Sequence, residues 1–307
     1  MHDIIIKNGT LINGLETPAF KADIAINGDT ITAIGENLGE AEKVIDAAGH
    51  LVTPGWVDIH THYDAQATWD PYLTPSSFHG VTTTVMGNCG VGFAPVKADK
   101  KDWLIGLMEG VEDIPGAALT EGIQWEWETF PEYLEALKKR NYVMDIGTQV
   151  PHGAVRAYVM GDRGAANEPA TDEDIAAMYE IVKEGLEAGA LGFSTSRTLI
   201  HKAIDGRPVP GTFAEKKEVF GIGQALADVG HGVFEMASQH ETLDVDIQWM
   251  DELSQKIGRP VSTNLSQIDE SPNLWREVLH RMEQAPEHSQ VIGQASGRAI
   301  GIVMGLD

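Results

Sequence analysis

The sequence is poor in basic residues: 22 Lys and Arg stand against 46 Asp and Glu, which gives a formal net charge of −24 at pH 7. A surface this acidic repels phosphate backbones and anionic lipid headgroups, so we expect no nucleic-acid partner and no membrane partner. No apolar run reaches the roughly 18 residues needed to span a bilayer. The first residues, MHDIIIKNGT, lack the apolar stretch of a secretory signal. These absences favour a cytoplasmic protein.

Cysteine is almost absent as well. Cys89 is the single cysteine of 307 residues, so no intrachain disulfide can form, which fits a reducing compartment. No Gly-rich dinucleotide fingerprint follows a strand, and a nucleotide-binding sheet therefore has little support. The remaining composition, 42% hydrophobic and 22% charged, is that of a globular chain with one large core.

The sequence pattern changes near Pro54. Residues 1–54 read as a small β unit of short strands and turns, in which Asn27-Gly28 predicts a hairpin with both central residues at positive φ. Residues 55–307 alternate buried strand-like runs with helical stretches, which predicts parallel βα units. Strands are expected near 51–59, 80–87, 143–150, 190–195, 232–237, 260–265 and 290–295.

Helix boundaries are visible between these strands. Thr171 and Thr212 each precede an acidic residue by three positions, which predicts a capping box at the start of two helices. Gly258 and Pro260 predict the end of the preceding helix. Seven strands with intervening helices approach an eight-stranded (β/α) barrel, and an open doubly wound sheet is the alternative.

The segment PGWVDIHTHYD carries the strongest chemical pattern. Side chains alternate along a strand, so His60 and His62 point the same way from the end of the first barrel strand and can bind one metal ion. Such a pair also arises by chance. Its place at the carboxyl end of a buried strand favours a site, because barrel enzymes carry their active sites there.

A second segment, MGNCGVGFAP, places Cys89 at the end of the next strand. The alternative is an inert buried thiol, the commoner fate of a single cysteine. However, Gly87 and Gly90 predict a tight turn, where a packing cysteine gains little. A thiolate is a good zinc ligand, so we predict that His60, His62 and Cys89 bind zinc.

Other polar residues follow later strands on the same expected face. His152 after the third strand and His201 after the fourth could donate hydrogen bonds to a substrate, and the alternative for each is a satisfied loop histidine. Arg197 could pair with a substrate carboxylate. We therefore predict that His152, Arg197 and His201 bind substrate, whereas Arg156 lies further into a helix and is expected to be structural.

Taken in order, PGWVDIHTHYD, GNCGVGFAP, VPHGAVRAYVMG and GFSTSRT resemble the amidohydrolase superfamily and, within it, the N-acyl-D-amino-acid deacylases. The resemblance covers essentially the whole chain. It implies an α/β fold: a metal-dependent-hydrolase (β/α) barrel, here incomplete after strand 7, with a small N-terminal β-sandwich unit. It also implies that His60, His62 and Cys89 are the zinc ligands, the thiolate standing where other amidohydrolases place a carboxylated lysine.

The sequence departs from this family at three places. Histidines end the family's fifth and sixth strands, whereas here these read FEMASQHET and VSTNLSQID. His240 lies about three residues beyond the position expected for the fifth-strand histidine. Near the end of the sixth strand, Asn264 and Ser266 are weak zinc ligands. The family's catalytic aspartate follows an eighth strand, but the sequence reaches Asp307 after the seventh. No general base is identified, and we expect at most one tightly bound zinc ion and feeble activity.

Three functions remain open. The first is zinc-dependent hydrolysis of the amide bond of a small N-acyl-D-amino acid, the metal polarising the carbonyl and lowering the pKa of a water molecule. The second is a catalytically incomplete fragment or interaction partner, because the edges of an unclosed barrel can pair with a second copy or a complementing chain. The third is hydrolysis of a cyclic amide or ester on the same fold.

Overall fold

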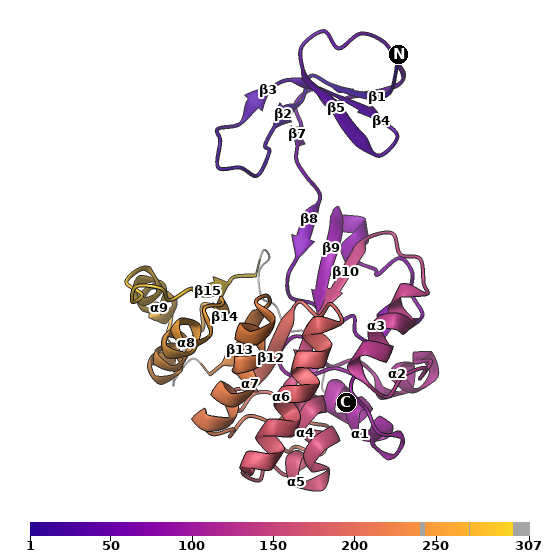
Figure 1. The fold of residues 1–307 in the computed structure, drawn as a ribbon. Coiled ribbons are helices and arrows are strands. Elements are labelled where there is room, and N and C mark those ends of the chain that lie inside the picture. Colours follow the sequence, from indigo (N-terminus) through magenta and orange to yellow (C-terminus); the bar gives the residue numbers. More distant parts are fainter. Residues whose placement is uncertain (240–242, 270, 297–307) are drawn as a thin grey trace. The chain divides into compact units, whose positions relative to one another are not determined.

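The computed structural model describes residues 1–239, 243–269 and 271–296. The chain divides into two compact units, Met1–Trp56 and a larger one that begins at Val57. The first unit holds two small sheets, with the strand orders β5-β4-β1-β6 and β3-β2-β7 (Figure 1). Its strands are β1 (His2–Lys7), β2 (Thr10–Leu11), β3 (Phe20–Lys21), β4 (Asp23–Asn27), β5 (Thr30–Gly35), β6 (Ala41–Asp46) and β7 (Leu51–Val52).

The expected hairpin connects β4 and β5, but its turn is displaced by one residue. Asn27 pairs with Thr30, so the two turn residues are Gly28 and Asp29 rather than Asn27 and Gly28. Of these, only Gly28 has a positive φ, +59°. Glycine adopts this conformation without a steric penalty from a Cβ atom, which explains why the turn is centred there.

The second unit contains parallel strands that follow one another in chain order. One sheet has the order β8-β9-β10 and the next runs from β11 to β15 without a break in sequence. This order is the one that strand-helix alternation predicts. The strands are β8 (Trp56–Asp58), β9 (Val81–Met86), β10 (Asp145–Thr148), β11 (Val150–Pro151), β12 (Gly192–Arg197), β13 (Val233–Ser238), β14 (Val261–Asn264) and β15 (Val291–Gln294).

Two of the expected strands are split. The strand predicted at 51–59 becomes β7, which pairs with β2 in the first unit, and β8, which pairs with β9 in the second. Pro54 lies between them and cannot donate to a ladder. The strand predicted at 143–150 is interrupted at Gln149, whose backbone N–H donates to Met86. The chain therefore pairs with β9 before this residue and with β12 after it.

Helices lie between the strands, and α4, α6 and α7 run side by side outside β12 and β13 (Figure 1). The helices are α1 (Lys101–Glu112), α2 (Gly116–Gly122), α3 (Phe130–Lys138), α4 (His152–Met160), α5 (Asp162–Ala165), α6 (Asp172–Glu187), α7 (Lys216–Val229), α8 (Leu243–Ile257) and α9 (Leu274–Glu283), with short 3-10 helices η1 (Gln66–Thr68), η2 (Ser76–His79) and η3 (Ala98–Lys100).

Two of the three predicted helix boundaries are confirmed. Thr171 forms a complete capping box with Asp174 at the start of α6, and α8 ends just before Gly258. The prediction of a capping box at Thr212 is wrong. Helix α7 begins at Lys216 after Glu215, without a side-chain cap, because the Thr212 hydroxyl donates instead to the carbonyl of Val209 in the preceding turn.

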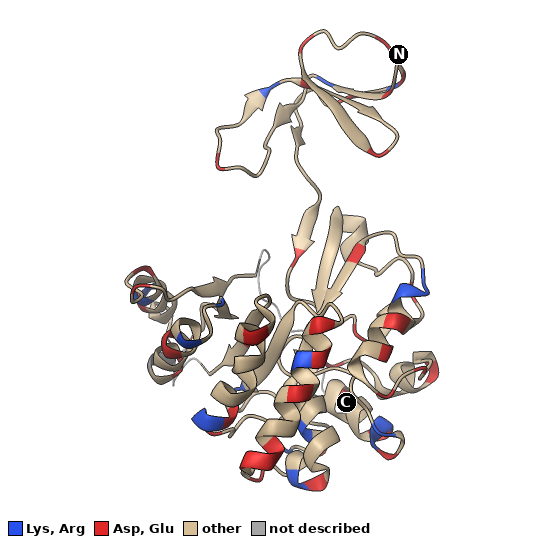
Figure 2. Cartoon of the chain, in the orientation of Figure 1, with Lys and Arg blue, Asp and Glu red and all other residues tan. Residues whose placement is uncertain are grey.

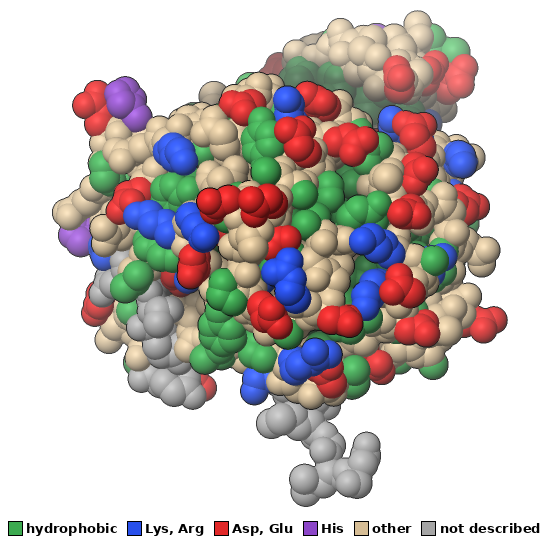
Figure 3. Space-filling model, turned by 60° about the horizontal axis from the view of Figure 1, so that its bottom comes forward, with side chains coloured by type: hydrophobic (Ala, Val, Ile, Leu, Met, Phe, Trp, Pro, Cys, Tyr) green, Lys and Arg blue, Asp and Glu red, His purple; other side chains and the backbone are tan. Residues whose placement is uncertain are grey.

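The core lies between the strands and the helices. Phe193 of β12 is paired in register with Phe234 of β13, and their ring centroids are 5.1 Å apart. Charged residues lie on the outer helices, with acidic residues prominent along α6 (Figure 2). On the face that Figure 3 turns forward, acidic and basic side chains are interspersed with apolar ones. Within the described residues, no helix combines the length and apolar character needed to cross a membrane.

Candidate metal centre

The structure brings His60, His62 and Cys89 together just beyond the ends of β8 and β9. One donor atom from each residue lies within 4.8 Å of those of the other two. His60 Nε2 is 3.2 Å from Cys89 Sγ, and the two imidazole rings meet edge to face with centroids 5.4 Å apart. Two residues from one segment and one from the next therefore form a three-donor cluster, as the sequence predicts.

The turn after β9 fixes the place of Cys89. The backbone of Cys89 has φ +56° and lies between Gly87 and Gly90, which also have positive φ. A side chain at Gly87 would collide with the backbone of Gln149, because its Cβ atom would lie only 2.2 Å from the carbonyl oxygen of that residue. The Cys89 N–H donates to Glu235 Oε2 at 2.9 Å, and the Gly90 N–H donates to Ser194 Oγ. Side chains of β12 and β13 thus hold the turn.

Each histidine has one ring nitrogen beside a side-chain oxygen. His60 Nδ1 lies 2.6 Å from Gln294 Oε1, and His62 Nε2 lies 3.2 Å from Glu112 Oε1. The remaining nitrogen of His62, Nδ1, is buried without a hydrogen-bond partner. Gln294 comes from β15 and Glu112 from the end of α1, so distant parts of the chain contribute to the surroundings of the cluster.

Burial dominates the electrostatics of this region. It lowers the pKa of His60 and lowers that of His62 further, so both imidazoles are neutral at pH 7. Burial, with the charges of Glu235 and other acids, raises the pKa of the Cys89 thiol well above its ordinary value. Desolvation also raises the pKa of Asp64 to about 7 and the pKa values of Glu112 and Glu235 to about 8.

These residues fit a bound zinc ion. Two neutral imidazoles and one sulfur are the donors that zinc prefers, and three protein ligands leave a position for a water molecule or substrate. Asp64 Oδ2 and Glu235 Oε1, like His62 Nδ1, are buried and lack a hydrogen-bond partner. Unpaired buried carboxyl oxygens are costly, and a nearby cation would reduce that cost.

Zinc binding is expected to release a proton from Cys89. The thiol is protonated at neutral pH because burial raises its pKa, whereas the metal binds the thiolate. The apparent zinc affinity should therefore rise with pH. Titration calorimetry in buffers of different ionisation enthalpy measures the protons released, and Cys89→Ser should release about one proton fewer than the wild type. Equal proton release by the two proteins would show that the thiol is not a ligand.

Among the predicted substrate residues, His201 lies near enough to His60 and His62 to interact electrostatically with both. Its Nδ1 lies 3.0 Å from Ser196 Oγ. Burial, followed by repulsion from His60, lowers the pKa of His201 to about 4, so the imidazole is neutral. His201 can therefore exchange hydrogen bonds with a small molecule beside the triad without adding charge, and its substrate role stays a prediction.

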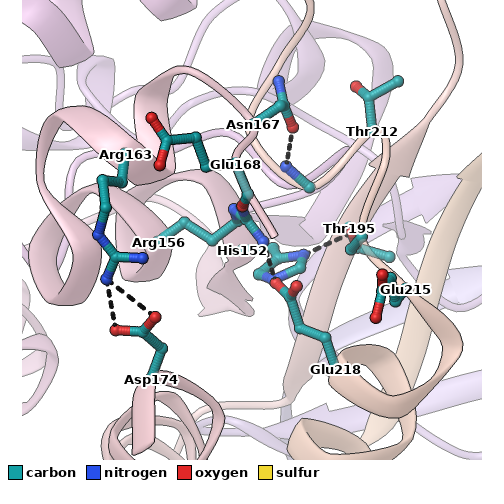
Figure 4. A network of polar contacts seen from close by, with 12 residues as sticks. His152, Arg156, Arg163, Asn167, Glu168, Asp174, Thr195, Thr212, Glu215 and Glu218 are labelled. Carbon is teal, nitrogen blue, oxygen red and sulfur yellow. Dashed lines mark hydrogen bonds and ion pairs between the residues drawn. The ribbon is translucent and has the colours of Figure 1, made fainter. Parts of the chain in front are cut away.

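Alternation along β12 directs Thr195 and Arg197 away from the Cys89 turn, and His152, the first residue of α4, contacts Thr195. Ser194 and Ser196 contact the Cys89 turn and His201, whereas Thr195 between them points to the helices. His152 Nδ1 is 2.8 Å from Thr195 Oγ1 and Nε2 is 3.0 Å from Glu218 Oε1, as Figure 4 shows. With both ring nitrogens engaged and no exposed surface, His152 could reach a substrate only by giving up one of these contacts.

Arg197 occupies the last position of β12, on the same side as Thr195. Its guanidinium pairs with Asp246 at 3.3 Å and donates to the carbonyl of Ala214. It also lies over the ring of Trp249, 4.6 Å from the centroid. These contacts engage the guanidinium with protein groups, and its predicted substrate role remains untested. The expected structural role of Arg156 agrees with its buried ion pair with Glu218.

Sequence reasoning missed four residues around the triad: Asp64, Glu112, Glu235 and Gln294. One signal was available for Glu235, because an acidic residue inside the apolar strand VFEMAS is unusual. Glu112 and Gln294 carry no local signal, since only the tertiary fold brings them to the histidines. His240 and Asp307, the other positions considered as ligand or base, lie outside the described residues.

Comparison with known proteins identifies the family of this chain. Residues 43–304 match the family model described as "Amidohydrolase family". The D-aminoacylase of Alcaligenes xylosoxydans xylosoxydans is 31% identical over 294 residues, which are 94% of this chain and 56% of that protein. The chain therefore spans about half the length of this relative.

Solved structures of deacylases resemble this chain as well. A D-aminoacylase structure that addresses the role of a binuclear metal centre matches with a TM-score of 0.78 and 29% identity over 96% of this chain and 58% of that one. The N-acyl-D-glutamate deacylase of Bordetella bronchiseptica, complexed with zinc and a phosphonate inhibitor, matches with a TM-score of 0.77 and 25% identity over 95% of this chain and 58% of that one. The α/β fold of this chain is thus similar to that of these deacylases over the part that it covers.

Proposed function

The chain belongs to the amidohydrolase family, and from this membership we propose that it takes part in zinc-dependent hydrolysis of the amide bond of N-acyl-D-amino acids. The observation that carries the proposal is the cluster of His60, His62 and Cys89 in a chain similar to D-aminoacylase. The sequential parallel strands β8 to β15 would form the main part of a (β/α) barrel, preceded by a separate β unit of about the first 54 residues.

His60, His62 and Cys89 would hold the metal ion at the carboxyl ends of the strands. When bound, zinc polarises a carbonyl group and lowers the pKa of a water molecule. The protein contributes a buried site in which such electrostatic effects are stronger than in water. Asp64, Glu112 and Glu235 supply carboxyl groups near it, and the neutral His201 would hydrogen-bond the substrate.

The test is a hydrolysis panel with the purified, zinc-loaded chain. Since no general base is identified, we expect only slow release of free amino acid from N-acetyl-D-amino acids, and none from their L enantiomers. Chelation should abolish the release, zinc should restore it, and His60→Ala should remove it while His79→Ala, at an exposed position, should not. Turnover of hydantoins or lactones alone would favour a cyclic-substrate hydrolase. No turnover by a chain that binds zinc would favour the catalytically incomplete alternative.

A further inference from the structure

We propose that Gln294 is a positioning residue of the metal centre, because its side-chain oxygen holds His60 in the tautomer that presents Nε2 to a metal ion beside Cys89. The inference rests on the proposed function, since it concerns the same site. No residue of β15 was among those expected at this site, and the contact joins positions 234 residues apart.

The hydrogen bond fixes which ring nitrogen carries the proton. Gln294 Oε1 is 2.6 Å from His60 Nδ1, and an amide oxygen can only accept, so Nδ1 donates. A neutral imidazole with its proton on Nδ1 has a free electron pair on Nε2. That atom lies 3.2 Å from Cys89 Sγ.

The surroundings of Gln294 fix the orientation of its amide group. Its amide nitrogen donates to Ser262 Oγ at 3.2 Å, which leaves the oxygen directed at His60. Its backbone pairs in register with Asn264, and its carbonyl accepts from the Leu265 N–H. Because its amide group and its backbone are both hydrogen-bonded, the Gln294 side chain loses little conformational freedom when it orients the His60 ring. In metalloproteins, such partners commonly fix the tautomer of a ligating histidine.

The first measurement is zinc affinity by competition with a chelator. Gln294→Ala is expected to weaken zinc binding about 10–100-fold, the usual effect of removing such a partner. Gln294→Glu should restore the affinity, because a carboxylate also accepts from Nδ1 and the Ser262 hydroxyl can rotate to donate to it. Gln290→Ala, at an exposed glutamine just before the same strand, is the matched control and should bind zinc as the wild type does.

The second measurement needs no metal. Proton–nitrogen NMR of histidine-labelled, metal-free protein should show the His60 proton on Nδ1 in the wild type and a mixture of tautomers in Gln294→Ala. A His60 proton on Nε2 in the wild type, or unchanged zinc affinity in Gln294→Ala, would overturn the inference. A wild-type chain that binds no zinc would overturn the proposed function, while the tautomer experiment would still decide the role of Gln294.

Discussion

Cys89→Ser is expected to reduce zinc affinity by more than about 100-fold. Removing an outer partner of a metal ligand usually costs up to that much, and Cys89 would contact the metal itself. Serine has nearly the same size and keeps the backbone N–H that donates to Glu235, so the turn should keep its shape. The serine hydroxyl stays protonated at neutral pH and is a far weaker zinc ligand than a thiolate.

The loss is measured by chelator competition and by cobalt substitution, since a bound thiolate gives cobalt(II) a charge-transfer absorption that serine cannot supply. His79→Ala removes an exposed imidazole outside the cluster and should leave both readouts unchanged. If Cys89→Ser binds zinc within a few-fold of the wild type, the thiol is not a ligand. Asp64, Glu112 and Glu235 would then be the first residues to test.

Glu218→Gln is expected to lower the free energy of unfolding by about 3–5 kcal/mol, the usual cost of removing one partner from a buried ion pair. Glu218 pairs with both His152 and Arg156, and all three side chains are at most 1% exposed. The substitution keeps the size of the side chain but leaves the Arg156 charge without its carboxylate. Figure 4 shows that α4 and α7 meet at this network, so the packing of the two helices depends on it.

Urea unfolding at pH 7 measures this effect, and Glu215→Gln is the matched control. Glu215 is exposed at the start of the same helix, and surface substitutions usually change stability by less than about 0.5 kcal/mol. Equal losses in the two variants would show that the buried pair contributes no special stability.

The stabilisation from Glu218 should also disappear in acid. Burial alone would raise the pKa of Glu218, but hydrogen bonds and charge from His152 and Arg156 outweigh it and lower the pKa to about 2. Because this pKa lies below that of an unfolded glutamate, the stabilisation is fully present above about pH 4.3. It is lost as the pH falls toward 2. The stability difference between wild type and Glu218→Gln should narrow over the same interval.

The sequence by itself determined the order of strands and helices in the second unit and brought together the candidate ligands His60, His62 and Cys89. The alternation of strands and helices and the capping box at Thr171 are predicted from local sequence patterns, and the structure confirms both. His60 and His62 are two residues apart, and Cys89 lies in a glycine-flanked turn after the next strand. Consecutive parallel strands are neighbours, so short-range patterns sufficed to bring these three residues together.

Only the tertiary structure decided what surrounds the triad. Gln294 of β15, the last strand of the sheet that runs from β11 to β15, contacts His60. Glu112 contacts His62 from the end of α1. Such contacts depend on the register and path of the chain between distant segments, which no local pattern encodes. The opposite directions of Ser196 and Arg197 likewise depend on where β12 begins. Because side chains alternate along a strand, a shift of one residue would exchange the two faces.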